Sequence, residues 1–165
     1  MTSRVKMALA ATAVLVGVSA TSAAAQSFTL TANLSGAGEA TQTANGVNTG
    51  AFGDATIIVN MTARTVNYTV RVFNLPSGIA ASHIHVGPAQ TAGPVVVNFT
   101  VPSTASNDFS YTGTVADTAF ILRPDQGIRS ADDMFQAILG GNAYVNVHSA
   151  VNPGGEIRGQ LVLKP

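Results

Sequence analysis

Residues 140–163 read GGNAYVNVHSAVNPGGEIRGQLVL, and the interpretation of the fold starts from this stretch. Apolar and polar residues alternate on both sides of an Asn-Pro-Gly-Gly run that favours a tight turn. A period of two is typical of half-buried β-strands. The stretch therefore predicts a β-hairpin. The side chains expected to face its core are Val145, Val147, Ile157, Leu161 and Leu163.

The same alternation continues through most of the chain before the hairpin. It predicts strands at residues 27–34, 52–61, 65–73, 95–100 and 108–115, and another around His83 and His85. Residues 132–139 differ, because their apolar side chains recur at helical spacing and Ser130 is placed to cap a helix. Many short strands, one helix and no repeated βαβ unit predict an all-β fold. We expect an antiparallel β-sandwich or a Greek-key barrel with one short helix.

The first 25 residues have the composition of an export signal. Arg4 and Lys6 precede an apolar run at residues 7–18, and three alanines at 23–25 offer a signal peptidase site. We expect cleavage after Ala25, which leaves one β domain over residues 26–165 in the periplasm or outside the cell. The apolar run is shorter than the roughly 20 residues that cross a bilayer, so no membrane insertion is expected after cleavage.

The composition excludes several classes of protein. The 165 residues carry a formal net charge of zero, so the basic patch that neutralises phosphates in a nucleic-acid-binding protein is not expected. The chain has no cysteine, which removes disulfides, thiol nucleophiles and thiolate metal ligands. Any metal site must therefore be built from nitrogen and oxygen donors.

All three histidines fall in two strand-like segments. His83 and His85 are two residues apart, so both side chains leave one face of a strand while Ile84 takes the core face. His148 lies on the polar face of the hairpin. If the two segments are neighbours in the sheet, the histidines share one surface with further polar side chains. This supporting set comprises Asn146, Glu156, Arg158 and Gln160.

These motifs resemble those of a known family. His83-Ile84-His85, GPVV at 93–96, YVNVHS at 144–149 and GEIRGQL at 155–161 are similar, in the same order, to motifs of the CHRD domain. That domain is named for chordin and is also found in many exported bacterial proteins. The resemblance spans nearly all of the chain after residue 25 and implies an all-β extracytoplasmic module of undefined activity. The His-X-His strand is also similar to the copper-binding strand of copper/zinc superoxide dismutases.

One element of the family pattern is altered in this chain. The family often has an early glutamate followed by a Val-Pro-Pro-like segment, whereas Glu39 is followed here by Ala-Thr-Gln. We therefore assign Glu39 no role from the sequence.

Four functions of the polar cluster remain open at this point. The working hypothesis is a copper or zinc site with His83, His85 and His148 as ligands, and with Glu156 as fourth ligand or as an orienting partner of His148. The second is a hydrogen-bond network of the same side chains that needs no ligand. The third is binding of an extracytoplasmic protein or glycan. The fourth is superoxide dismutation, which three histidines serve poorly because they cannot hold both a copper and a zinc ion; no catalytic residue is assigned.

Overall fold

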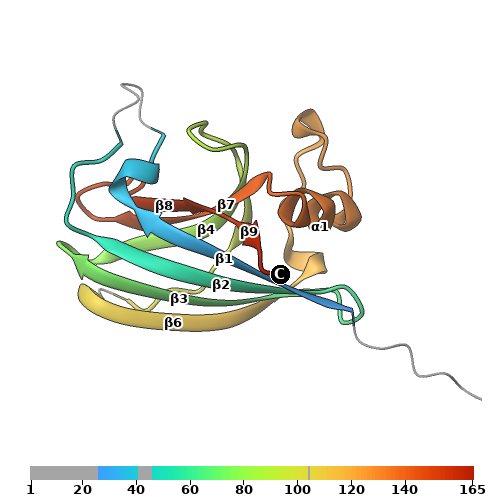
Figure 1. Ribbon diagram of the computed structural model, residues 1–165, viewed down its shortest axis with the longest axis horizontal. Coiled ribbons are helices and arrows are strands. Elements are labelled where there is room, and N and C mark those ends of the chain that lie inside the picture. The colour runs from blue at the N-terminus through green and yellow to red at the C-terminus, as the bar shows by residue number, and fades with distance from the viewer. Residues whose placement is uncertain (1–25, 41–45, 104) are drawn as a thin grey trace, which may run out of the picture.

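The computed structural model describes residues 26–40, 46–103 and 105–165, so the predicted export signal lies outside the described residues. Most of its regular structure is strand (Figure 1). The strands are β1 (Ser27–Ser35), β2 (Phe52–Asn60), β3 (Thr65–Leu75), β4 (Ile79–Val86), β5 (Val95–Asn98), β6 (Asn107–Ala116), β7 (Ala143–Ser149), β8 (Ile157–Gln160) and β9 (Val162–Leu163). The helices found in these ranges are α1 (Ala131–Leu139) and three 3-10 turns, η1 (Gly36–Gly38), η2 (Asp117–Ala119) and η3 (Pro124–Gln126).

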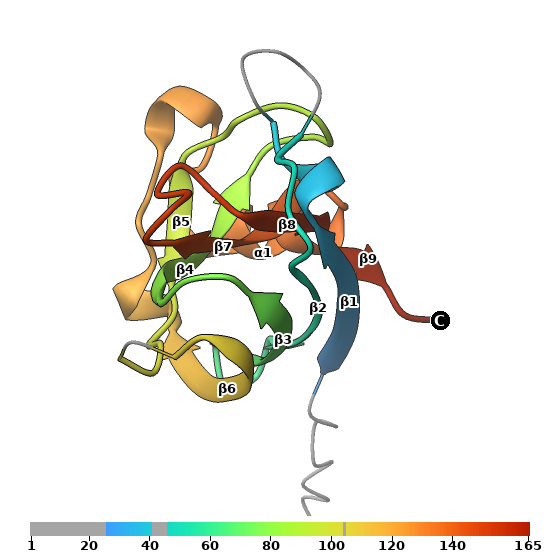
Figure 2. The same cartoon turned by 90° about the vertical axis from the view of Figure 1, so that its left-hand side faces the viewer.

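The nine strands form one antiparallel sheet that curls into a nearly closed barrel (Figure 2). Their order is β5-β4-β7-β8-β1-β2-β3-β6, and β9 pairs with β1. The all-β prediction is confirmed. Side chains alternate along the strands, so that every second one fills the barrel interior. Core side chains without exposed surface include Leu30, Ile57, Val70, Ile84 and Val145.

The predicted hairpin is present as β7 and β8, in which Val147 pairs with Ile157. Four of its five expected core residues are buried, but Leu163 is 44% exposed, so the prediction for that residue was wrong. The reason is a change of partner. Leu163 belongs to β9, which lies beyond the last β7–β8 pair at Gln160 and, of the described strands, pairs only with β1.

Strand β8 approaches β1 closely at Gly159. A Cβ atom at this position would lie 2.2 Å from the carbonyl oxygen of Asn33, so a larger residue would push the two strands apart. The close approach allows Ser35 of β1 to pair with Arg158 of β8. This pairing joins the strands that carry the histidine region to the β1-β2-β3-β6 part of the barrel.

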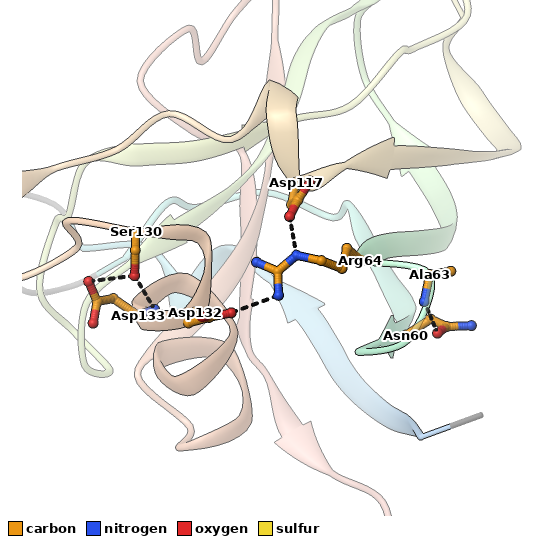
Figure 3. Close-up of polar contacts among 7 residues, drawn as sticks. All are labelled: Asn60, Ala63, Arg64, Asp117, Ser130, Asp132 and Asp133. Carbon is orange, nitrogen blue, oxygen red and sulfur yellow. Dashed lines mark hydrogen bonds and ion pairs between the residues drawn. The ribbon is translucent and has the colours of Figure 1, made fainter. Parts of the chain in front are cut away.

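Helix α1 lies at one end of the barrel and is tied there by Arg64, in the turn between β2 and β3 (Figure 3). Arg64 Nε donates to Asp117 after β6, and Nη1 donates to Asp132 Oδ1 over 2.8 Å. The guanidinium carbon lies 5.3 Å from the centre of the Phe135 ring. One arginine therefore joins a turn, a strand end and the helix.

The N-terminus of α1 is capped as predicted. The Ser130 hydroxyl accepts a hydrogen bond of 3.1 Å from the backbone N–H of Asp133, and the same hydroxyl donates to the Asp133 carboxylate over 3.0 Å (Figure 3). At nine residues, α1 is too short to cross a membrane, and no other helix of the described residues qualifies either.

Candidate metal centre

The two histidine segments are neighbours in the sheet. Strands β4 and β7 pair antiparallel, with His83 opposite Asn146, His85 opposite Tyr144 and Ala81 opposite His148. The adjacency on which the sequence hypothesis depended is therefore confirmed. The histidines share one face of the sheet because the strand period places alternate residues on the same side.

The three imidazole rings form a compact group. His83 Nδ1 lies 3.1 Å from His148 Nε2, and ring centres are separated by 4.9 Å for this pair and by 5.5 Å for His83 and His85. One nitrogen from each ring can be chosen so that all three lie within 4.8 Å of one another. No other group of three potential ligands of this kind was found in the described residues.

Backbone carbonyls set the tautomers of two of the rings. His85 Nδ1 lies 2.8 Å from Gly93 O, and His148 Nδ1 lies 2.9 Å from Pro153 O. A carbonyl oxygen only accepts hydrogen bonds, so each Nδ1 carries the proton, and in the neutral ring each Nε2 carries a lone pair. Metal-bound histidines in proteins are usually oriented in this way. The Nε2 atom of His85 is buried and has no hydrogen-bond partner among the described residues.

The surroundings of all three imidazoles favour the neutral form. Burial, followed by the nearby His148 and His85, lowers the pKa of His83 to about 4. Burial also lowers the pKa of His85 to about 4, although its bond to Gly93 acts in the opposite direction. Burial lowers the pKa of His148 as well, against the effect of its bond to Pro153. Neutral imidazole is the form that binds transition metals.

A stack of three side chains supports His85. The His85 ring lies parallel to the Tyr144 ring, with centres 4.9 Å apart, and the guanidinium carbon of Arg158 lies 3.3 Å from the centre of the Tyr144 ring. The Tyr144 hydroxyl accepts from the backbone N–H of Gly93 over 2.9 Å. Tyr144 is thus packed between a cation and a candidate ligand, and it contacts the residue that orients this ligand.

Arg158 and Gln160 hold the loop between β4 and β5. Arg158 donates to Thr91 O over 2.9 Å and to Pro88 O over 2.8 Å. Gln160 donates to Gly87 O over 3.0 Å and to Gly141 O over 2.9 Å. The same loop carries Gly93, so these two side chains anchor the loop that contains the orienting carbonyl of His85. Both were predicted to support the histidines, and the contacts describe how each would do so.

Glu156 contacts the β7–β8 turn, whereas Arg158 contacts the β4–β5 loop. It is fully buried, and its Oε2 accepts from Ser149 Oγ over 2.6 Å and from Asn152 Nδ2 over 2.5 Å. Burial raises its pKa, but hydrogen bonds from Ser149, Thr49 and Asn152 outweigh this effect, and the pKa of Glu156 lies below its ordinary value. The orienting contact of His148 is Pro153 O, and Glu156 does not make this contact. Its other predicted role, as fourth ligand, stays a prediction.

The structure adds Glu39, which sequence reasoning left without a role. Glu39 is 5% exposed, and both of its carboxylate oxygens lie 2.9 Å from Asn146 Nδ2. Asn146 stands directly opposite His83, so Glu39 covers the sheet beside the histidines. Burial raises the pKa of Glu39 to about 7, although Asn146 and Arg158 lower it. The available signal was that Glu39 is the one charge between residues 35 and 50.

Comparison with known proteins identifies the family. The model of the CHRD domain matches residues 30–161, which is most of the chain. The chain belongs to the CHRD domain family. The histidines, Asn146, Arg158 and Glu39 all lie inside the matched region of this CHRD domain. No curated protein and no solved structure matches the chain.

Proposed function

We propose that this CHRD domain is an exported binding module that holds one copper or zinc ion through His83, His85 and His148. The proposal includes export by the signal-like residues 1–25 and assigns no catalysis. Its main support is one observation, namely three imidazoles that present nitrogens within 4.8 Å of one another while backbone carbonyls contact Nδ1 of two of them.

The distance between two of the nitrogens suits coordination. Nitrogens bound to one ion at about 2.0–2.1 Å lie about 2.9 Å apart at a right angle and about 3.3 Å apart at a tetrahedral angle. The observed distance of 3.1 Å between His83 Nδ1 and His148 Nε2 lies between these values. In the metal-free chain the same contact is a hydrogen bond in which His83 Nδ1 donates. An ion would replace this bond, and His83 would move its proton to Nε2.

The third nitrogen completes the donor set. Within the described ranges His85 Nε2 is buried without a partner, and buried polar atoms in folded proteins rarely stay unsatisfied. A metal ion bound by this lone pair would satisfy it. Imidazole donors suit copper and zinc, and three protein ligands leave a position for water or a further ligand.

The serines next to the histidines support binding rather than acyl transfer. Ser82 Oγ donates to Asn146 O over 2.9 Å, and Ser149 Oγ donates to Glu156. Both hydroxyls are therefore directed away from the imidazoles, whereas a nucleophilic serine requires a hydrogen bond to its base.

Metal analysis of the tag-free domain 26–165 tests the proposal. After incubation with copper or zinc and removal of free metal, we expect one ion per chain by elemental analysis. The double variant His85→Ala/His148→Ala should lose it. Asn98→Ala is the matched control, because Asn98 pairs with His83 on β5 but is exposed and offers no imidazole.

Two outcomes would refute a metal site. One is the absence of stoichiometric metal on the wild-type domain, and the other is full retention of metal by the double variant. Dismutase activity of the copper-loaded domain above that of the double variant would instead place it among enzymes.

A further inference from the structure

A cavity of about 310 Å³ lies beside the histidine centre and shares Pro153 with it. Pro153 lines the cavity, and its carbonyl oxygen is also the contact of His148 Nδ1. The lining is mainly small and apolar, with Ala40, Val47 and Val151 in addition to Pro153. Glu39 is the one titratable side chain among the lining residues.

Glu39 makes no ion pair within the part of the chain that the structure describes. The ion pairs found among the described residues join Arg64 to Asp117 and Asp132, and Arg71 to Asp54. Arg158 lies near enough to influence Glu39, but it donates to backbone carbonyls of the β4–β5 loop. Residues 41–45, which follow the cavity wall in the chain, read TQTAN and contain no basic residue.

A buried carboxylate without a cation is costly for a fold. Buried charges in proteins are normally paired or bound to a metal, and an unpaired one tends to become neutral. Among the described residues, the donor that contacts Glu39 is the neutral amide of Asn146. Groups kept in such unfavourable surroundings at the edge of a cavity are characteristic of ligand sites, where the ligand supplies what is missing.

We propose that this cavity binds a small organic cation, a primary ammonium group with a short apolar chain, and that Glu39 is its counter-ion. The ammonium donates hydrogen bonds to the Glu39 carboxylate, and the apolar chain contacts Val47, Val151 and Pro153. The cavity volume falls at the lower end of the range typical of small-molecule sites. A bare inorganic ion would leave the apolar walls uncovered. The site does not depend on metal binding by the histidines.

Titration of the 15N-labelled domain with n-butylammonium chloride tests this inference by NMR. We expect saturable amide shifts at Val47, Val151 and Gly154, in both the metal-free and the metal-loaded protein. 1-Butanol has the same chain without the charge and should bind at least about tenfold more weakly, and sodium chloride at equal ionic strength should cause no such shifts. Glu39→Gln should weaken n-butylammonium binding by a similar factor, and Asp54→Asn, whose carboxylate is paired with Arg71, should not.

Three outcomes would overturn the inference. Equal affinity of the wild-type domain and Glu39→Gln would show that Glu39 is no counter-ion. Equal binding of 1-butanol would assign the cavity to neutral ligands, and this comparison needs only the wild-type domain, so it does not depend on the folding of a variant. An absence of shifts at the cavity residues would exclude the site. A domain that binds n-butylammonium but no metal would refute the metal site alone.

Discussion

Replacing Glu39 by glutamine should change how the stability of the domain depends on pH. Burial raises the Glu39 pKa from its ordinary value of 4.5 to about 7, so the folded state binds this proton more tightly than the unfolded state does. The proton-linked stability is fully present below pH 4.5 and is lost as the pH rises through about 7. Above that pH the folded domain carries the full cost of a buried carboxylate.

The size of this effect follows from the rise of about 2.5 units in the pKa of Glu39 on folding. Each unit corresponds to about 1.4 kcal/mol, so the wild-type domain should lose up to about 3 kcal/mol between pH 4.5 and pH 8 because of Glu39 alone. Glutamine has no titratable group, and its amide oxygen can still accept from Asn146. For a domain of this size, the difference amounts to a shift of roughly 10 °C in Tm.

Urea unfolding followed by far-UV circular dichroism is a suitable assay, since the chain contains no tryptophan. The relevant quantity is the difference in unfolding free energy between Glu39→Gln and the wild type at each pH. Subtracting the two profiles removes the contribution of the histidines, which destabilise the fold as the pH falls below 6.5. As the pH rises, the unfolding free energy of Glu39→Gln should increase relative to that of the wild type. A difference that stays constant from pH 4.5 to pH 8 would refute the reasoning, because Glu39 would then titrate normally.

Three further substitutions test the supports of the site and the fold. Arg158→Met removes two hydrogen bonds to the β4–β5 loop, so amide exchange at residues 89–93 should accelerate and metal affinity should fall; unchanged exchange would contradict the proposed role of Arg158. Gly159→Ala places a Cβ atom 2.2 Å from Asn33 O and should cost about 2 kcal/mol of unfolding free energy, whereas Gly50→Ala, with open space around it, should cost little; equal costs would contradict the close approach of β8 to β1. Arg64→Met should lower the unfolding free energy only slightly, because its ion pairs are exposed to solvent, but should accelerate amide exchange in α1; unchanged exchange there would show that Arg64 does not hold the helix.

The sequence was most informative where apolar and polar residues alternate regularly along the chain. The period of two assigned Ile84, Val145, Val147 and Ile157 to the core, because a strand offers only two faces and one of them must be apolar. Leu163 followed the same pattern but lies outside the core, since burial also requires a neighbouring strand to cover it. Periodicity describes a strand and not its neighbours.

The candidate site was predictable in its ligands but not in its surroundings. Spacing placed His83 and His85 on one face, whereas their pairing with the His148 strand depends on the topology of the whole sheet. Arg158 was expected on an outward polar face, but it is 2% exposed because the β4–β5 loop folds over it. Glu39 lies in irregular chain, where no periodicity indicates which side chains turn inward. Contacts made by loops therefore account for most of what the sequence did not reveal.

The pairing of β4 with β7 also determines when the histidine centre can form during folding. His83 and His148 are 65 residues apart, so their contact closes a long loop that contains β5, β6 and α1. Contacts of such high sequence separation carry a large entropic cost and slow the folding of β proteins. An ion held by these histidines would bind after the sheet has assembled, and its binding energy would be absent from the folding transition state. It would therefore slow unfolding without accelerating folding, which is a kinetic form of protection for a chain that has no cysteine and hence no disulfide.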